Sequence, residues 1–295
     1  MFRLAVVGAG RMGQLHLTVL REVAEIEVVG VVEPAWQVRQ QLERFGLPVF
    51  ADVPALVAST PVDGWLVAVP TPAHLQVVME LSYFGAPILC EKPAGLSVGE
   101  ALQIGRVASS TGVRVQVAYW RRFVPSLKLL RARILAGELG TVQSIICQQW
   151  DEAPPSQAFR QSSGGIFIDM GVHEVDQLRW LTGSELDPVA AVGRIDPASG
   201  DQDSAHGLVE LSSGASGVIS LGRFFPGGDL VAVEVFGSRG HERLVLLDPQ
   251  QADVAQRLAL QEQLRDFIAG GSAGATMADA VAAFRVAEAL QAELA

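Results

Sequence analysis

The chain has 295 residues and carries a net charge of −10 at pH 7. This length allows one large or two ordinary domains, and the acidic balance argues against nucleic acid or an anionic membrane as partner. No apolar run has the length of a membrane span, and residues 2–7 are too short a run for a signal peptide. Cys90 and Cys147 lie far apart without metal-ligand spacing. We therefore expect reduced thiols, a cytoplasmic protein and no metal site.

The first 33 residues contain a compact and specific pattern. An apolar run at 2–7 leads into the turn Gly8-Ala9-Gly10-Arg11-Met12-Gly13, a helical pattern follows, and a second apolar run ends on Glu33. In such a turn, Gly8 permits the tight bend, Gly10 lets backbone N–H groups reach a pyrophosphate, and Gly13 lets the helix lie close to the strand. The order strand, turn, helix, strand, acid predicts a dinucleotide site.

The acid selects between the two nicotinamide dinucleotides. Glu33 comes about 20 residues after the last glycine, where a carboxylate accepts hydrogen bonds from ribose hydroxyls and repels a 2′-phosphate. The pattern therefore favours NAD over NADP. The alternative is a glycine turn in an α/β fold that binds nothing, and the flanking strands and the acid weigh against it.

Alternating strands and helices continue to residue 118. Helical patterns cover 36–45, 54–58, 71–84 and 97–110, and strand patterns fall near 49 and at 64–69, 87–90 and 113–118. Strands that alternate with crossover helices predict an α/β domain with a parallel, doubly wound sheet at residues 1–118.

The pattern changes after residue 118. Helices are expected at 125–136 and 170–181, with a strand at 141–150 between them, and strands then follow one another with few helices between. These strands are expected at 189–195, 205–211, 216–224, 230–236 and 242–247, before helices at 258–269 and 277–294. The pattern predicts a second, α+β domain at 119–295, with a mostly antiparallel sheet covered by helices on one face.

A lysine follows the predicted strand at 87–90. Among 22 basic residues only Lys92 and Lys128 are lysines, and Lys92 falls at the edge where parallel sheets bind ligands. Pro93 restricts its backbone, and Glu91 can pair with its ammonium group. A surface lysine in a turn is the alternative.

A second candidate site lies at the start of the helix expected near residue 170. Asp169 and His173 are four residues apart, so both project from one helix face. A carboxylate beside an imidazole favours its protonated form and can fix its tautomer, which suits His173 as a general base. A satisfied polar contact is one alternative. A metal site with Glu174 and Asp176 is another, but no second histidine completes a ligand set.

Other polar residues are candidates for ligand contact. Thr71 is expected as the N-cap of the 71–84 helix, and His74 either touches ribose or nicotinamide or is a polar residue of the first turn. Trp120 and Arg121 suit a polyhydroxylated ligand, although a domain-interface core is an equal alternative for Trp120.

The proline-rich loop near residue 154 adds two more candidates. Asp151 and Arg160 flank it and could bind substrate hydroxyls; ordinary loop charges are the alternative.

Together these residues resemble one family, the Gfo/Idh/MocA oxidoreductases, which include glucose–fructose oxidoreductase and inositol 2-dehydrogenase. The resemblance covers nearly the whole chain and is closest to the inositol dehydrogenase branch at residues 119–183. The similar segments, in order, are Gly8–Gly13, Pro70–His74, Glu91–Pro93, Arg121–Phe123 and Asp169–His173.

The resemblance implies a Rossmann domain and an open-faced antiparallel sheet that often mediates dimers or tetramers, with a last helix that can return to the first domain. It implies Lys92, Asp169 and His173 as the catalytic set. It also implies cofactor contacts from the turn, including Arg11 and Met12, and from Glu33, Thr71, His74 and Glu91. The chain departs from the family pattern in its Glu33 (often Asp), its bulky Trp120 and its short C-terminal part.

The expected function is hydride transfer between a secondary hydroxyl of a cyclic polyol or sugar and NAD, by a homodimer or homotetramer. Two alternatives stay open. One is redox-neutral glycoside cleavage by the same fold, and the other is a non-catalytic NAD-binding sensor.

Overall fold

The computed structural model describes residues 1–197, 199–247 and 252–294 and divides into two compact units. Unit 1 contains residues 1–95, 99–118 and 260–278, and unit 2 contains the rest of the described chain. The sequence placed 119–295 in one domain and allowed the last helix to return to the first. In the structure the returning segment is 260–278, whereas residues from 279 onward belong to unit 2.

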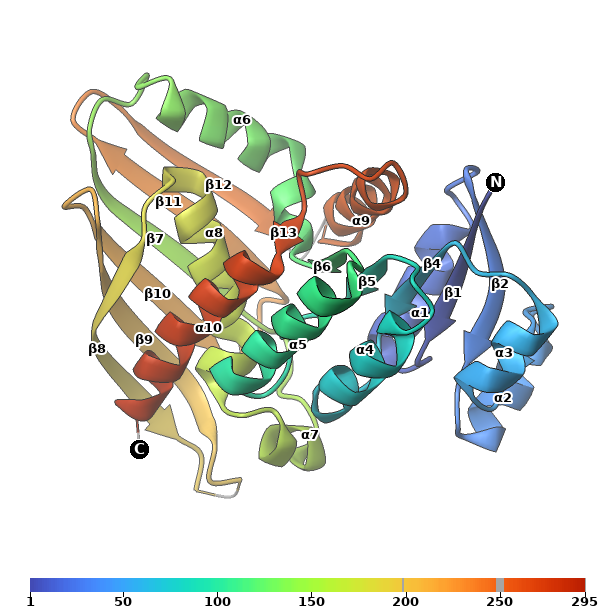
Figure 1. The fold of residues 1–295 in the computed structure, drawn as a ribbon. Coiled ribbons are helices and arrows are strands. Elements are labelled where there is room, and N and C mark those ends of the chain that lie inside the picture. Colours follow the sequence, from blue (N-terminus) through green and yellow to red (C-terminus); the bar gives the residue numbers. More distant parts are fainter. Residues whose placement is uncertain (198, 248–251, 295) are drawn as a thin grey trace. The chain divides into compact units, whose positions relative to one another are not determined.

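Unit 1 is an alternation of strands and helices, as the sequence predicts (Figure 1). Its elements are β1 (Phe2–Val7), α1 (Arg11–Leu20), β2 (Ile26–Val32), α2 (Trp36–Glu43), β3 (Val49–Phe50), α3 (Val53–Ser59), β4 (Gly64–Val67), η1 (Thr71–Ala73), α4 (His74–Ser82), β5 (Ile88–Cys90), α5 (Val98–Thr111), β6 (Val115–Val117) and β13 (Ala275–Thr276). Most of the long helix α9 (Ala252–Ile268) also falls in this unit.

The strands of unit 1 form one sheet in the order β13-β6-β5-β4-β1-β2-β3. All neighbours are parallel except β13, which pairs antiparallel with β6. The chain proceeds outward from β1 in both directions, so the topological switch lies between β1 and β4. In doubly wound sheets the carboxyl ends of the strands at this switch form the ligand site.

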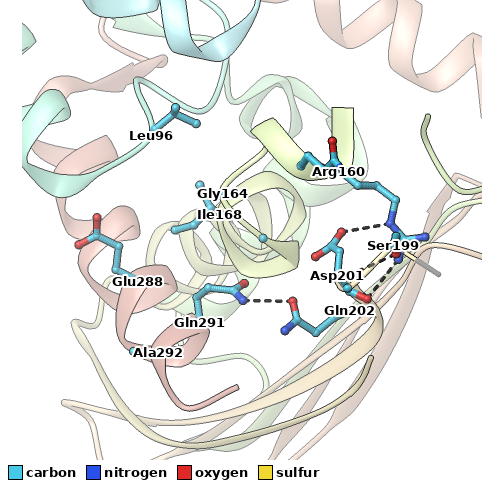
Figure 2. Close-up of a pocket in the computed structure, with 13 residues that line it drawn as sticks. Leu96, Arg160, Gly164, Ile168, Ser199, Asp201, Gln202, Glu288, Gln291 and Ala292 are labelled. Carbon is cyan, nitrogen blue, oxygen red and sulfur yellow. Dashed lines mark hydrogen bonds and ion pairs between the residues drawn. The ribbon is translucent and has the colours of Figure 1, made fainter. Parts of the chain in front are cut away.

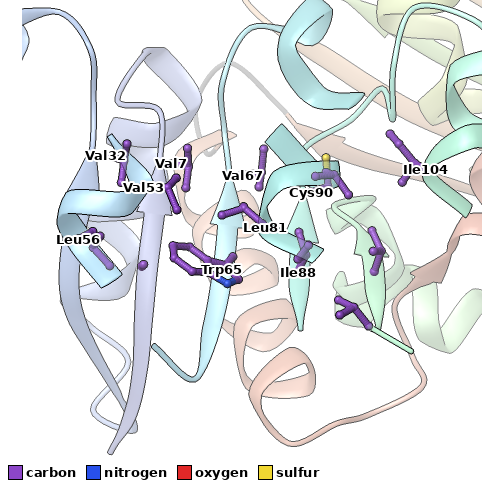
Figure 3. Close-up of a cluster of buried hydrophobic side chains, with 14 of the residues drawn as sticks. Val7, Val32, Val53, Leu56, Trp65, Val67, Leu81, Ile88, Cys90 and Ile104 are labelled. Atoms are coloured by element: carbon purple, nitrogen blue, oxygen red, sulfur yellow. The ribbon is translucent and has the colours of Figure 1, made fainter. Parts of the chain in front are cut away.

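The core of unit 1 explains why its strands read as continuous apolar runs. Side chains from β1, β2, β4 and β5 pack against helices α3, α4 and α5 on one face of the sheet, as Figure 3 shows. Trp65 is fully buried in this cluster. The alternate strand residues, such as Leu4 and Leu66, are equally buried, so both faces of this parallel sheet are covered.

Unit 2 carries the antiparallel part of the fold. Its elements are η2 (Trp120–Phe123), α6 (Pro125–Leu135), β7 (Val142–Trp150), α7 (Gln157–Ser162), the π-helix η3 (Phe167–Gly171), α8 (Val172–Thr182), β8 (Leu186–Ile195), β9 (Gln202–Leu211), β10 (Ser216–Gly222), β11 (Leu230–Gly237), β12 (His241–Leu247) and α10 (Met277–Ala292).

Its sheet has the order β12-β11-β7-β10-β9-β8, and only the central pair of β7 and β10 is parallel. Helices α8 and α10 lie over one face of this sheet (Figure 1): a Cβ at Gly217 of β10 would contact Leu178, and one at Gly207 of β9 would contact Leu290. The predicted α/β plus α+β fold class is confirmed.

Local differences from the expectation have local causes. The predicted 71–84 helix begins as a 3₁₀ turn with Pro70, not Thr71, at the N-cap, and becomes α-helical at His74. Helix α7 lies in a segment predicted as loop, where the Ser156 hydroxyl accepts from the Phe159 N–H at 3.3 Å. Six residues are too few for an apolar period to be visible. Among the helices of the described residues, none is long and apolar enough to cross a membrane.

Candidate active site and cofactor turn

The glycine turn closes tightly on the sheet. Gly8 has φ of +94°, and a Cβ there would lie 2.7 Å from the Ala68 carbonyl oxygen at the end of β4. A Cβ at Gly13 would run into the Gly8 carbonyl. Only glycine therefore fits at the two positions: the end of β4 leaves no room for a Cβ at Gly8, and the backbone of the turn leaves none at Gly13 in α1.

Gly10 differs from Gly8 and Gly13, because a side chain there would point into open space. It has extended backbone (φ −68°, ψ −166°), and a Cβ there would meet no heavy atom of the described residues within 4 Å. Gly10 is also the N-cap of α1 and has no side chain to cap the helix, so the first-turn N–H groups remain for another acceptor. This is the cradle that a pyrophosphate requires.

Glu33 reaches this turn from the end of β2. Its Oε2 accepts from the Ala9 N–H at 3.0 Å and its Oε1 from the Ala35 N–H at 2.9 Å. The carboxylate thus lies against the glycine turn, as a residue that binds adenosine ribose must. The open space at Gly10, the uncapped helix and this carboxylate fit NAD.

Gly10→Ala is expected to raise the Kd for NAD at least about tenfold, because the added methyl group occupies the space that the pyrophosphate needs. The unfolding free energy should change by less than about 1 kcal/mol, since alanine tolerates this backbone conformation. Calorimetric titration and urea unfolding measure the two effects. Gly13→Ala is the contrasting variant and should lose stability. Wild-type NAD affinity in a folded Gly10→Ala protein would contradict the role of Gly10.

Lys92 follows β5 at the same carboxyl edge of the sheet, and its peptide bond to Pro93 is cis. The Lys92 N–H donates to Glu91 Oε2 at 3.1 Å, while Glu91 Oε1 lies 2.6 Å from Nε2 of His16 on α1. Burial raises the pKa of Glu91, but the His16 hydrogen bond and the His16 and Lys92 charges together bring it below its ordinary value. No sequence motif gives His16 a role, but in the structure its ring holds the Glu91 carboxylate.

His74 also contacts the Lys92–Pro93 turn. Its Nδ1 lies 2.7 Å from the Pro93 carbonyl oxygen and its Nε2 3.0 Å from the Val69 carbonyl oxygen. Burial lowers its pKa, against the two carbonyl acceptors that favour protonation. At 1% exposure, His74 ties the end of β4 to the Lys92–Pro93 turn. This arrangement favours a bracing role over the contact with ribose or nicotinamide expected as one alternative.

In unit 2, Asp169 and His173 lie where the π-helix η3 passes into α8. Single π turns within helices occur often at functional sites. Asp169 Oδ2 accepts from Arg223 Nη1 at 3.0 Å, and its side chain is 13% exposed. The His173 ring lies edge-on to Tyr119, with 5.7 Å between ring centroids.

The helix that carries His173 also carries two buried carboxylates. Glu174 and Asp176, which the sequence offered as possible metal ligands, are both buried. Arg122 donates to both carboxylate oxygens of Asp176, at 2.9 and 2.5 Å. Buried charges are tolerated when paired in this way.

Two predicted substrate residues of unit 2 are also buried. Trp120 is 6% exposed and Arg121 is 3% exposed. Arg121 donates to Glu174 Oε1 at 2.6 Å and to Gln149 Oε1 at 2.7 Å. The Gln149 amide in turn donates to Asp151 Oδ1 at 3.1 Å. This geometry favours Arg121 as a support for the half-buried Asp151 over the direct contact expected for it.

Arg160, on α7, lies in a cluster of carboxylates. Its guanidinium pairs with Asp201 at 3.2 Å and with Asp203 at 3.0 Å, and approaches Asp196 at 3.5 Å. Arg160 and Asp201 form part of the wall of a cavity of about 610 Å³ within unit 2, which Figure 2 shows. Gln202 and Gln291, hydrogen-bonded at 3.1 Å, also line this cavity.

Neither thiol is part of a reactive site. Cys90 and Cys147 are free and fully buried, and burial raises the pKa of both thiols. Within the described part of the chain, no group of three His, Cys, Asp or Glu side chains could hold a metal ion.

The doubly wound sheet, the cradle at its switch point and the acid beside it define a dinucleotide-binding protein. Residues 2–119 match the model of the oxidoreductase family with an NAD-binding Rossmann fold, and residues 127–242 match the Gfo/Idh/MocA C-terminal domain. The chain belongs to the Gfo/Idh/MocA family, as the sequence motifs predicted. It is an NAD-dependent oxidoreductase.

Known proteins are similar to this chain over most of its length. It is 43% identical to the rhizopine catabolism protein MocA of Rhizobium meliloti, over 98% of this chain and 93% of the relative. It is 37% identical to the myo-inositol dehydrogenase Hyg17 of Streptomyces leeuwenhoekii, over 80% and 74%. The crystal structure of a myo-inositol dehydrogenase from Corynebacterium glutamicum superposes with a TM-score of 0.87 at 25% identity, covering 100% of this chain and 96% of that one.

Proposed function

We propose that this enzyme transfers a hydride between a secondary hydroxyl carbon of a cyclic polyol or sugar, of the inositol type, and NAD. One observation carries the proposal. Lys92 follows β5 at the same edge of the sheet as the glycine turn. The buried Glu91 carboxylate, itself paired with His16, accepts from the Lys92 N–H, and the buried His74 ring contacts the carbonyl of the following Pro93. A cation held at the cofactor edge is suited to stabilise negative charge on a reacting oxygen.

The chemistry divides among three side chains. NAD, when bound, supplies the hydride-accepting chemistry. His173 takes the proton of the reacting hydroxyl as general base, and Asp169 orients it. Lys92 donates a hydrogen bond to the same oxygen as charge develops on it. In the reductive direction the proton returns from His173 to the oxygen.

The polyol class rests on two supports. Myo-inositol dehydrogenases are among the similar proteins, at 37% identity for Hyg17. In this chain, Asp151 is half-buried at the end of β7 and is supported by the Gln149–Arg121–Glu174 chain of hydrogen bonds. A carboxylate fixed in this way suits the binding of substrate hydroxyls, and the aromatic ring of Trp120 lies in the same unit.

The decisive experiment follows NADH absorbance with a panel of inositols, aldoses and amino sugars, with NAD and NADP in parallel. We expect NAD-dependent turnover of at least one inositol-type polyol. No turnover across the panel would overturn the proposed substrate class, and a preference for NADP would overturn the role of Glu33. Release of the aglycone from a chromogenic glycoside without net NADH would instead establish the redox-neutral glycosidase.

We also propose that the enzyme is a cytoplasmic homodimer or homotetramer. The sheet face opposite α8 and α10 exposes apolar side chains from three strands: Val192 is 66%, Leu208 48% and Val245 43% exposed. Apolar side chains exposed on one sheet face favour association with a second copy. The free, buried cysteines agree with a reducing compartment. A monomer in sedimentation equilibrium at micromolar concentration would contradict the oligomer.

A further inference from the structure

Arg223 is a fully buried arginine that no sequence motif singled out. It comes directly after β10 and is 0% exposed. Its own N–H donates to the Asp203 carbonyl at 2.7 Å, which fixes the backbone where the side chain begins. A guanidinium without contact with water must be paired, so the groups around it indicate its purpose.

The Arg223 guanidinium pairs with two carboxylates from different segments of unit 2. Nη1 donates to Asp169 Oδ2 at 3.0 Å, and Nε lies 3.0 Å from Asp201 Oδ2 and donates to the Gln202 carbonyl at 3.2 Å. Asp169 keeps 13% of its side chain exposed, whereas Arg223 keeps none. Arg223 therefore supports Asp169 from the protein interior and leaves the accessible part of the carboxylate on the other side.

Asp201 extends the support to the cavity wall. It pairs with Arg223 at 3.0 Å and with Arg160 at 3.2 Å, so one carboxylate bridges two guanidiniums (Figure 2 shows the Arg160 side). Arg160 also reaches Asp203 at 3.0 Å. Asp169 is thus one end of a chain of ion pairs whose other end lines the cavity, and each member restricts the rotamers of the next.

We propose that Arg223 is a positioning residue for Asp169. It fixes the orientation of the Asp169 carboxylate at the π-helix turn, and Asp201 fixes Arg223. The inference rests on the proposed dehydrogenase function, in which Asp169 orients the base His173. Arg223 is not itself a catalytic residue, because its buried guanidinium acts through the carboxylate.

The test is a double-mutant cycle on kcat with the variants Arg223→Met, Asp169→Asn and the double variant. Arg223→Met is expected to lower kcat about 10- to 100-fold in the wild-type background and by less than about threefold in the Asp169→Asn background. Arg223→Lys should recover part of the loss in kcat. Lysine keeps the positive charge but cannot pair with Asp169 and Asp201 through two separate nitrogens of a planar guanidinium. The Kd for NAD should stay within about twofold of the wild-type value, because the partners of Arg223 (Asp169, Asp201 and Gln202) lie outside the glycine turn.

A purely structural role gives a different result. Arg122→Met is the matched control, because Arg122 is another buried arginine of unit 2 and its carboxylate partners, Asp176 and Asp279, are not in the proposed catalytic set. Its effect on kcat should be the same fold-change in both backgrounds. If Arg223→Met behaves like this control, or leaves kcat unchanged in the wild-type background, the positioning role is overturned.

Failure of the proposed function is recognised separately, as a wild-type protein without activity on the whole panel. The cycle is then measured on the free energy of unfolding in urea. Losses that add for Arg223→Met and Asp169→Asn would overturn the inference, since paired side chains give non-additive losses.

Discussion

Lys92→Ala is expected to lower kcat by several hundred-fold with the polyol that the panel identifies. A buried or water-excluded hydrogen-bond donor aimed at developing negative charge stabilises the transition state by about 3 to 4 kcal/mol, and each 1.36 kcal/mol is a factor of about ten in rate. The Kd for NAD should change little, because the glycine turn, Gly10 and Glu33 remain intact.

The chain contains its own control for this variant. Lys128 is the other lysine of the sequence, exposed on α6, with its ammonium 5.2 Å from the centre of the Phe123 ring. Lys128→Ala removes the same charge and side chain from a surface helix and should leave kcat within about twofold, as surface substitutions usually do. Turnover near the wild-type value in Lys92→Ala, with wild-type folding, would remove Lys92 from the mechanism.

His173→Asn should lower kcat by about 10²- to 10⁴-fold, the usual contribution of a positioned general base. Asparagine keeps a polar side chain of similar size beside Tyr119 but cannot take a proton from the substrate. Oxidation by the wild-type enzyme should slow as the pH falls and the base becomes protonated. In His173→Asn the residual rate should lack that dependence.

His206→Asn is the matched control for His173→Asn. It is exposed on β9 and lies outside the proposed catalytic set, so His206→Asn should retain wild-type kcat and pH profile. A His173→Asn protein that folds, binds NAD and keeps more than about one tenth of wild-type turnover would identify another group as the base.

The cofactor half of the protein could be predicted from sequence because its signals are local. Strand, glycine turn, helix, strand and Glu33 all lie within 33 consecutive residues, and the alternation that follows predicts a parallel sheet with few alternatives. The motifs at Lys92 and at Asp169–His173 were visible for the same reason, since each is contained in a few residues.

Residues 260–278, which return to unit 1, show what local sequence patterns cannot predict. The sequence predicted a helix at 258–269, but its pattern does not say which unit the helix joins. The structure places 260–278 in unit 1, where β13 adds an antiparallel edge strand to the parallel sheet. Two residues of strand carry no detectable period, and their partner, β6, is about 160 residues earlier.

By itself, the sequence determined the fold class, the NAD-binding turn and the residues that could carry chemistry. The tertiary structure decided which charged groups support them: His16 with Glu91, His74 with Pro93, and Arg223 with Asp169. It also assigned the buried Arg121 and Arg160 to ion pairs. The physical reason is that the partner of a buried charge comes from a segment 19 to 75 residues away, which only the folded chain brings close. A motif, in contrast, lies within a few consecutive residues and is visible in the sequence.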